Sequence, residues 1–203
     1  FTSFSENLML PSNKSEIISY NELHKRVCKM ANTLISLGVK KGDRVAIYLP
    51  MIPELSISVL ACARIGAIHS VIFAGFSSTA LAARINDSSC KLVITSDGGY
   101  RGNKTIDLKS IVDKALKDCP CVQHVIVAER TKTEVKMHSS RDIYLKDLLK
   151  TASEVHEAEP MDSEDPLFIL YTSGSTGKPK GMVHTVGGYM VYAAYTFKNV
   201  FAY

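Results

Sequence analysis

The sequence has no long hydrophobic run, no recognisable secretory signal in its first residues and no repeat. No stretch approaches the roughly 18 consecutive apolar residues that a membrane-spanning helix needs. Residues 1–14 are polar and mixed, unlike a secretory signal. No internal repeat or low-complexity tract is present. We therefore expect a globular protein without a membrane partner.

Paired cysteines are also missing. The five cysteines are an odd number, and none stands in C-x-x-C spacing, which argues against both a disulfide framework and a zinc site. Cys28 and Cys62 fall within apolar helical patterns, so we expect them to be reduced thiols in a core. No combination of histidine and carboxylate has metal-ligand spacing, so we expect no metal site within the chain itself.

Neither sign of charge is concentrated in one place. The 24 Lys and Arg residues exceed the 20 Asp and Glu residues by four, and they are spread along the sequence. A dedicated nucleic-acid-binding protein would carry a concentrated basic face, so we expect no nucleic-acid partner. A chain of 203 residues with 46% apolar residues can form one domain that buries roughly 70% of its unfolded surface.

Short apolar strands alternate with helical patterns along most of the chain. Ser19 and Glu22 form a capping box before the first helix, and Gly38 is a suitable stop. We expect strands at 44–49, 68–73, 91–95, 124–128 and from 167 onwards, and helices at 20–37, 53–65, 79–85, 106–117, 143–151 and 186–201. Loops, turns or linkers are expected at 1–16, 97–103, 129–142 and 153–166. This alternation predicts an α/β fold, with a mainly parallel sheet and helices on both faces.

The most informative stretch lies between Tyr171 and Gly181. It is a loop of glycines and hydroxylated residues that follows an apolar strand and carries Lys178 and Lys180. Glycine lets the backbone turn sharply, so that several N–H groups can face one anion. Hydroxyl and ammonium groups add charge-assisted hydrogen bonds of roughly 1.5–3 kcal/mol each. The stretch therefore predicts a phosphate-binding loop.

Two common nucleotide-binding motifs do not fit this loop. Gly174 and Gly177 are only three positions apart, and Lys178 is followed by Pro179 where a Walker A loop has the Ser or Thr that binds magnesium. No G-x-G-x-x-G follows a strand, which excludes a dinucleotide fingerprint.

Residues 171–181, YTSGSTGKPKG, resemble the signature loop of the adenylate-forming (AMP-binding) superfamily, which includes acyl-CoA synthetases and luciferases. Residues 18–23 are similar to the superfamily's first motif, and 45–54, 60–67, 164–170 and 183–189 look like acetyl-CoA synthetases in particular. The resemblance implies part of the large N-terminal domain of such an enzyme, with a loop that grips the β- and γ-phosphates of ATP. The phosphate-binding residues that it implies are Thr172, Ser173, Gly174, Ser175, Thr176, Gly177, Lys178 and Lys180.

A second loop, at 97–104, follows an expected strand and should lie at the carboxyl edge of the sheet, where open α/β folds bind ligands. Composition alone favours a solvated turn. The resemblance implies instead that Arg101, Gly102, Asn103 and Lys104 contact the nucleotide end of coenzyme A. Relatives commonly carry a second arginine at the place of Lys104, and lysine keeps that charge but loses the bidentate fork.

The resemblance implies an AMP-forming acetate–CoA ligase that uses ATP and CoA, with Mg²⁺ arriving on ATP. We expect residues 1–203 to be a partial AMP-binding domain without the C-terminal lid, without a complete catalytic set, and inactive alone. The missing initiator methionine also indicates a longer protein. A propionate-preferring synthetase and a non-catalytic nucleotide-binding module remain alternatives. We expect a cytoplasmic location, with the mitochondrial matrix as an alternative, and the oligomeric state stays open.

Overall fold

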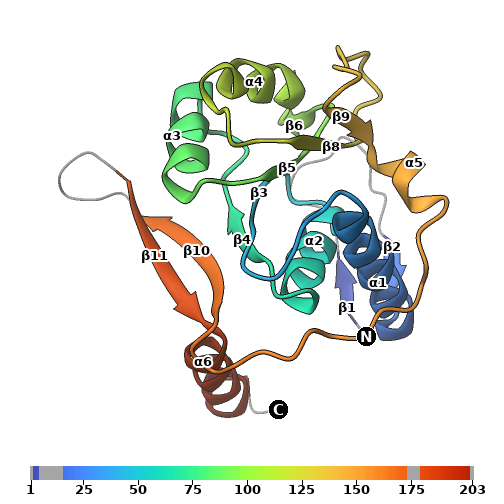
Figure 1. Cartoon of the computed structure of the whole chain (residues 1–203). Helices are drawn as coiled ribbons and strands as arrows, with labels where there is room; N and C mark the ends of the chain where they lie inside the picture. Colours follow the sequence, from blue (N-terminus) through green and yellow to red (C-terminus); the bar gives the residue numbers. More distant parts are fainter. Residues whose placement is uncertain (1, 5–15, 173–178, 202–203) are drawn as a thin grey trace.

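The computed structural model describes residues 2–4, 16–172 and 179–201 (Figure 1). The strands are β1 (Thr2–Phe4), β2 (Glu16–Ile18), β3 (Arg44–Tyr48), β4 (Ile68–Val71), β5 (Leu92–Ser96), β6 (Gly99–Arg101), β7 (Lys104–Ile106), β8 (His124–Ala128), β9 (Asp142–Tyr144), β10 (Pro166–Thr172) and β11 (Lys180–Thr185). The helices are α1 (Tyr20–Ser36), α2 (Pro53–Arg64), α3 (Ser78–Ser88), α4 (Leu108–Ala115), α5 (Leu145–Leu149) and α6 (Val186–Asn199), and a 3-10 turn, η1 (Leu116–Asp118), follows α4. Among these described elements, no helix is both long enough and apolar enough to cross a lipid bilayer.

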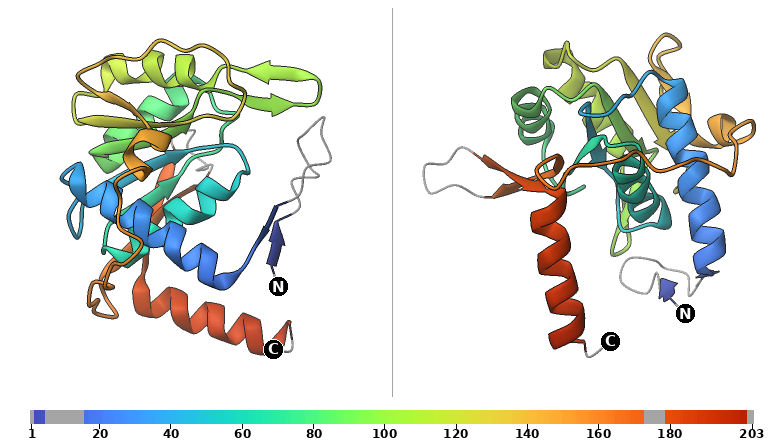
Figure 2. Two further views of the ribbon diagram at one scale, coloured as in Figure 1. Left: turned by 90° about the vertical axis from the view of Figure 1, so that its right-hand side faces the viewer. Right: turned by 60° about the horizontal axis from the view of Figure 1, so that its bottom comes forward.

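The central sheet has seven strands in the order β11-β10-β4-β3-β5-β8-β9. All neighbouring strands from β10 to β9 are parallel, and only β11 runs antiparallel, to β10. β10 pairs with β4 only at Phe168 and His69. Beyond this point β10 and β11 leave the sheet together as a two-stranded ribbon (Figures 1 and 2). The predicted α/β class with a mainly parallel sheet is confirmed.

Two helical layers cover the sheet, and the alternation of residues along β3 shows why. Val45 and Ile47 pack with α1, α2 and α5 in one apolar cluster. Ala46 and Tyr48 point to the other face, where they pack with α3 and α4. A strand with apolar residues on both faces is stable only when helices cover both sides, so the prediction of two covered faces is confirmed.

The first helix follows the predicted capping pattern in part. The Ser19 hydroxyl accepts a hydrogen bond from the Glu22 backbone N–H at 3.2 Å, as an N-cap should. The Glu22 carboxylate accepts a hydrogen bond from Arg26 Nε at 2.7 Å. At the far end, Gly38 has a φ of +79°, which glycine adopts without strain.

Several short strands occur where the sequence predicts loops or assigns no element. Residues 1–16 contribute β1 and, with 17–18, β2, which form a separate two-stranded sheet. β9 pairs with β8 at the edge of the main sheet, within and after the loop predicted at 129–142. β11 follows the phosphate loop as the partner of β10. These strands have three to six residues. They are too short to show a clear apolar pattern, so their formation depends on the strands with which they pair.

Candidate functional site

The strand ends that lead into the two candidate loops are the carboxyl ends of parallel strands. β10, β4, β3 and β5 are parallel, so their carboxyl ends face one side. The segment 173–178 connects β10 to β11, and the β6–β7 hairpin begins three residues after β5. Open α/β sheets bind their ligands outside this edge. The 97–104 loop therefore follows the carboxyl end of β5, as expected from the sequence.

The phosphate loop itself lies mostly outside the described residues. This applies to Ser173, Gly174, Ser175, Thr176, Gly177 and Lys178. Of the predicted phosphate-binding residues, only Thr172 and Lys180 are described, and they pair with one another across the ends of β10 and β11. Both are exposed. The ribbon thus brings the two ends of the loop together and leaves the Lys180 side chain accessible to a ligand.

Tyr171 attaches the loop end of this ribbon to helix α3. Its Oη donates a hydrogen bond to Asp87 Oδ2 at 2.6 Å. Burial and the neighbouring Asp87 carboxylate raise the pKa of the Tyr171 phenol above its ordinary value, so the hydroxyl remains a donor at neutral pH. Gly181 pairs with Tyr171, and a Cβ at this glycine would lie 3.2 Å from the tyrosine ring. The absent side chain lets the ring lie across the partner strand.

The predicted CoA loop is a hairpin rather than a simple turn. β6 and β7 pair in antiparallel fashion, and Arg101 lies opposite Lys104 next to the turn. Gly102, with a φ of +57°, and Asn103 form the turn, as in a type II′ hairpin that has glycine first. All four residues are exposed. Two cations therefore flank the tip of a projecting hairpin (Figure 2).

The hairpin corrects one prediction. Arg101 and Lys104 were expected directly before a helix that begins at Ile106, but β7 lies between the turn and α4. The helix begins at Leu108, and Asp107 is its N-cap, accepting from Ser110 N at 2.8 Å. The two cations therefore lie away from this helix N-terminus, and any anion that they bind is held by the hairpin.

Asp97, which the sequence analysis did not single out, holds the base of the hairpin. Its side chain is 1% exposed. Its Oδ1 accepts hydrogen bonds from the backbone N–H groups of Gly98, Arg130 and Thr131 at 2.7, 2.7 and 3.1 Å. One carboxylate oxygen thereby joins the start of the hairpin to the loop after β8. An aspartate directly after a buried strand was the available sequence signal.

An apolar pocket of about 310 Å³ lies between the hairpin and the ends of β3 and β4. Its walls include Pro50, Phe73, Gly75, Tyr100 and Ile106, and Arg101 stands among the lining residues. A cation beside an apolar pocket with aromatic walls suits a ligand that has a flat ring and a phosphate. No local sequence pattern indicates this pocket, because its walls come from three separate segments.

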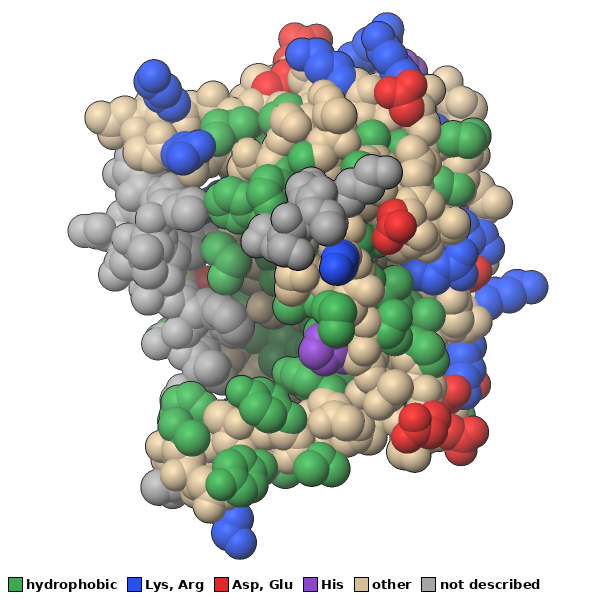
Figure 3. Space-filling model, turned by 90° about the vertical axis from the view of Figure 1, so that its left-hand side faces the viewer, with side chains coloured by type: hydrophobic (Ala, Val, Ile, Leu, Met, Phe, Trp, Pro, Cys, Tyr) green, Lys and Arg blue, Asp and Glu red, His purple; other side chains and the backbone are tan. Residues whose placement is uncertain are grey.

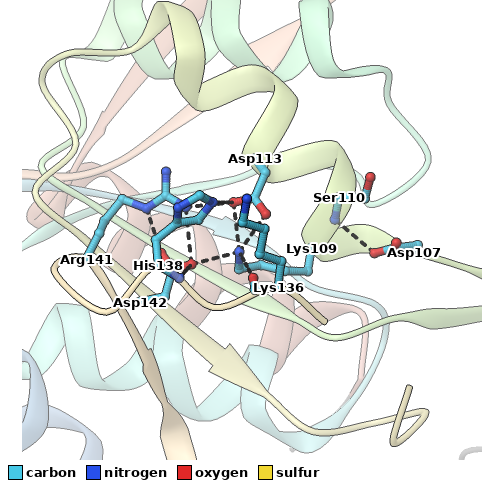
Figure 4. Close-up of polar contacts among 8 residues, drawn as sticks. All are labelled: Asp107, Lys109, Ser110, Asp113, Lys136, His138, Arg141 and Asp142. Atoms are coloured by element: carbon cyan, nitrogen blue, oxygen red, sulfur yellow. Dashed lines mark hydrogen bonds and ion pairs between the residues drawn. The ribbon is translucent and has the colours of Figure 1, made fainter. Parts of the chain in front are cut away.

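A buried ion network joins α4 to the start of β9 (Figure 4). Lys109 is 1% exposed, and its Nζ contacts Asp113 at 2.7 Å and Asp142 at 2.8 Å. Arg141 also binds both carboxylates, each at 2.6 Å. Burial acts to raise the pKa of Asp142, but hydrogen bonds from Arg141 and Lys109 outweigh it and hold the pKa below its ordinary value.

This network is structural in character. Asp113, His138 and Asp142 have atoms close enough together to hold a metal ion. The Lys109 ammonium, however, already lies between the two carboxylates and supplies the positive charge that a metal would bring. Asp142 begins β9, and the Lys109 backbone N–H donates to the Asp97 carbonyl oxygen at 3.5 Å, so the network joins α4 to β9 beside the base of the hairpin. Sequence spacing did not reveal it, because 109–113 and 138–142 meet only in the folded chain.

Comparison with known proteins identifies the family of this chain. The sequence profile described as "AMP-binding enzyme" matches residues 4–203. Acetyl-coenzyme A synthetase of Escherichia coli (strain K12) is 59% identical over 194 residues, covering 95% of this chain and 30% of that protein. The same enzyme of Bdellovibrio bacteriovorus (strain ATCC 15356 / DSM 50701 / NCIMB 9529 / HD100) is 56% identical over 193 residues, covering 95% of this chain and 30% of that protein.

The structural comparison points to the same group. Acetoacetyl-CoA synthetase from Streptomyces lividans superimposes with a TM-score of 0.84 at 28% sequence identity, covering 91% of this chain and 28% of that chain. The chain thus spans about 30% of the length of the curated relatives it matches. Fold, loop signature and matched length together show that the chain belongs to the AMP-binding enzyme family.

Proposed function

We propose that this chain is the part of an AMP-forming acetate–CoA ligase that holds the phosphates of ATP and the nucleotide end of CoA. The observation that carries the proposal is the loop YTSGSTGKPKG within a chain 59% identical, over 95% of its length, to an acetyl-coenzyme A synthetase. Residues 1–203 would then form a partial AMP-binding domain that needs further sequence for turnover.

The proposed reaction has two steps. An acetate oxygen attacks the α-phosphorus of ATP, the bond to the β-phosphate oxygen breaks, and pyrophosphate leaves with its Mg²⁺. The CoA thiolate then attacks the acyl carbon of acetyl-adenylate, a C–S bond forms, and AMP leaves with the bonding electrons. Both steps depend on holding charged groups in line and neutralising the charge of the leaving phosphate.

The phosphate loop would act mainly on the leaving pyrophosphate. Thr172 and Lys180 stand opposite one another at the ends of β10 and β11, so the segment between them is closed at its base. Such a glycine-rich loop can direct backbone N–H groups and hydroxyls at one anion. Lys180 would add a full positive charge from the side. Mg²⁺ belongs to the MgATP substrate in this proposal.

The hairpin and its pocket would hold CoA. Arg101 and Lys104 can pair with phosphate groups at the tip, and arginine does so through two parallel hydrogen bonds. The neighbouring apolar pocket, with walls from Phe73 and Tyr100, suits a purine ring. The five free cysteines fit a reducing compartment, which we propose to be the cytoplasm.

Calorimetric titration of the 203-residue chain with MgATP tests the phosphate site. We expect saturable binding that Lys180→Ala weakens roughly tenfold or more, because one charge-assisted contact is lost. Lys150→Ala is the matched control, since that lysine pairs with Asp147 on the surface of α5. Failure of the parent chain to bind MgATP would refute the proposed phosphate site.

A pyrophosphate-release assay on the same chain tests the second part of the proposal. We expect no acetate-dependent release from residues 1–203 alone, even when MgATP binds. Release of pyrophosphate by the isolated chain would show that residues 1–203 suffice for the first step. The proposal that they form only a partial domain would then be wrong.

A further inference from the structure

Arg84 is a buried cation that the proposed reaction does not yet use. It lies on α3, it is 8% exposed, and its Nη1 donates a hydrogen bond to the Ala80 carbonyl oxygen at 2.7 Å. Burying a guanidinium is costly unless its surroundings compensate for the lost water. The groups that contact the Arg84 guanidinium therefore indicate the role of this residue.

Two aromatic rings enclose the guanidinium. Its Cζ lies 4.4 Å from the ring centre of Phe76 and 5.6 Å from the ring centre of Tyr171. Such cation–π contacts are attractive, and they are stronger where water is excluded. Phe76 belongs to the turn after β4, whereas Tyr171 belongs to the end of β10. Arg84 thus joins two segments that are 95 positions apart in the sequence.

The Tyr171 side of this stack leads directly to the phosphate loop. Tyr171 precedes Ser173 by two residues, and its ring crosses Gly181 on the returning strand. Its Oη also donates to Asp87, one turn further along α3 than Arg84. Helix α3 therefore holds Tyr171, at the end of β10 that leads into the loop, through one cation–π contact and one hydrogen bond.

The Phe76 side leads to the apolar pocket. Phe76 meets Phe73 edge to face, with ring centres 5.7 Å apart, and Phe73 lines the pocket beside the hairpin. Arg84 therefore contacts Tyr171, which leads into the phosphate loop, and Phe76, which packs on the pocket beside the hairpin. Its planar, permanently charged side chain can stack on two rings at once, which a lysine ammonium cannot do.

We propose that Arg84 is a positioning residue for the phosphate loop: in contact with the rings of Phe76 and Tyr171, it fixes the end of β10 from which the loop starts, so that the loop can present its donors to phosphate. The proposal rests on the proposed function of that loop. Arg84 acts through Tyr171, and it is not assigned a contact with the nucleotide.

The test uses the 203-residue chain and two independent measurements. One is the dissociation constant for MgATP, and the other is amide hydrogen exchange in peptides that cover 171–181, measured without nucleotide. We expect Arg84→Gln to weaken MgATP binding by roughly fivefold and to speed exchange in these peptides by a similar factor. Arg84→Lys keeps the charge but not the planar stack, so it should shift both quantities in the same direction by a smaller factor.

The matched control is Arg64→Gln. Arg64 is a partly buried arginine on α2 whose Nε and Nη2 hold the His156 carbonyl oxygen at 2.9 and 2.6 Å, on the opposite face of the sheet. The Arg64→Gln substitution should change the melting temperature without changing amide hydrogen exchange at 171–181 or the affinity for MgATP. Lys180→Ala should weaken MgATP binding without speeding exchange in α3.

The outcomes separate the two proposals. If both Arg84 variants leave exchange and affinity as in the parent chain, the positioning role is wrong while the phosphate site stands. If the parent chain does not bind MgATP but the Arg84 variants still loosen 171–181, the nucleotide function fails and the mechanical role of Arg84 is retained. If Arg64→Gln loosens 171–181 as much as Arg84→Gln does, the effect is general destabilisation, and the positioning role is overturned.

Discussion

Lys109 shows how a single buried charge can hold distant parts of this chain together. Its ammonium contacts Asp113 on α4, Asp142 on β9 and the Lys136 carbonyl oxygen at 2.9 Å. The arrangement balances two carboxylates against Lys109 and Arg141. Removing one member of a buried network leaves the others without compensation, which costs more than the intact network contributes.

Lys109→Met should therefore lower the free energy of unfolding by about 3 kcal/mol or more, because two carboxylates lose a buried cation. Urea denaturation followed by circular dichroism would measure this loss. Lys146→Met is the control, since the Lys146–Glu129 pair at 2.7 Å is exposed and should contribute at most about 1 kcal/mol. An equal effect of the two substitutions would contradict the structural role given to the buried network.

Among the elements, the β6–β7 hairpin depends on its surroundings more than on its own sequence. Its strands have three residues each, which is too few for a stable isolated hairpin. Asp97 supplies the missing support, because its Oδ1 accepts from three backbone N–H groups at the hairpin base. The position of Arg101 and Lys104 thus depends on a residue that lies four positions before the first of them.

Asp97→Ala should leave one buried and two partly buried backbone N–H groups without their acceptor and lower stability by about 3 kcal/mol. It should also weaken binding of CoA while leaving MgATP affinity unchanged, since the phosphate loop lies on another strand. Thermal unfolding and titration with each ligand would measure these effects.

The control for this prediction is Asp107→Ala. That residue caps α4 through Ser110 N at 2.8 Å and does not hold the hairpin base. It should lower stability by about 1 kcal/mol without a selective loss of CoA binding. If Asp97→Ala changes stability but not CoA affinity, the hairpin does not determine the CoA site.

At the scale of the whole molecule, helices cover both faces of the sheet at β3, β5 and β8, but α6 presents an apolar surface to solvent. No residue of α6 is buried in the described part of the chain. Val191, Tyr192 and Tyr195 are 73%, 69% and 67% exposed, and hydrophobic side chains extend along this helix in Figure 3. Exposed apolar patches of this kind promote association.

The 203-residue chain should therefore self-associate and bind a hydrophobic dye. Replacing both Val191 and Tyr192 by lysine should reduce both effects without lowering stability, because neither side chain packs in a core. Sedimentation velocity over a range of concentrations and dye fluorescence would measure the change. Ile17→Lys with Tyr20→Lys is the control, since these residues are equally exposed at the opposite end of the chain. A parent chain that stays monomeric and binds no dye would contradict this prediction.

The amino-acid sequence by itself determined the α/β class, the long elements and the nucleotide loop signature. Helices such as α1 and α2, and the strands β3, β5 and β8, carry apolar patterns and caps that are readable locally, and their positions are confirmed. The glycines, hydroxyl groups and lysines of 171–181 predict phosphate binding from their chemistry alone. No folded context is needed for either inference.

Only the tertiary structure decided which segments support the loops. The hairpin, the strands β9 and β11, the pocket beside Arg101 and the stack around Arg84 each depend on residues that are distant in sequence. Short strands have weak local preferences, and a buried charge finds its partners only when the chain is folded. The sequence therefore indicated the groups that can bind phosphate, and the packing of α3 and the sheet determined how the bases of their loops are held.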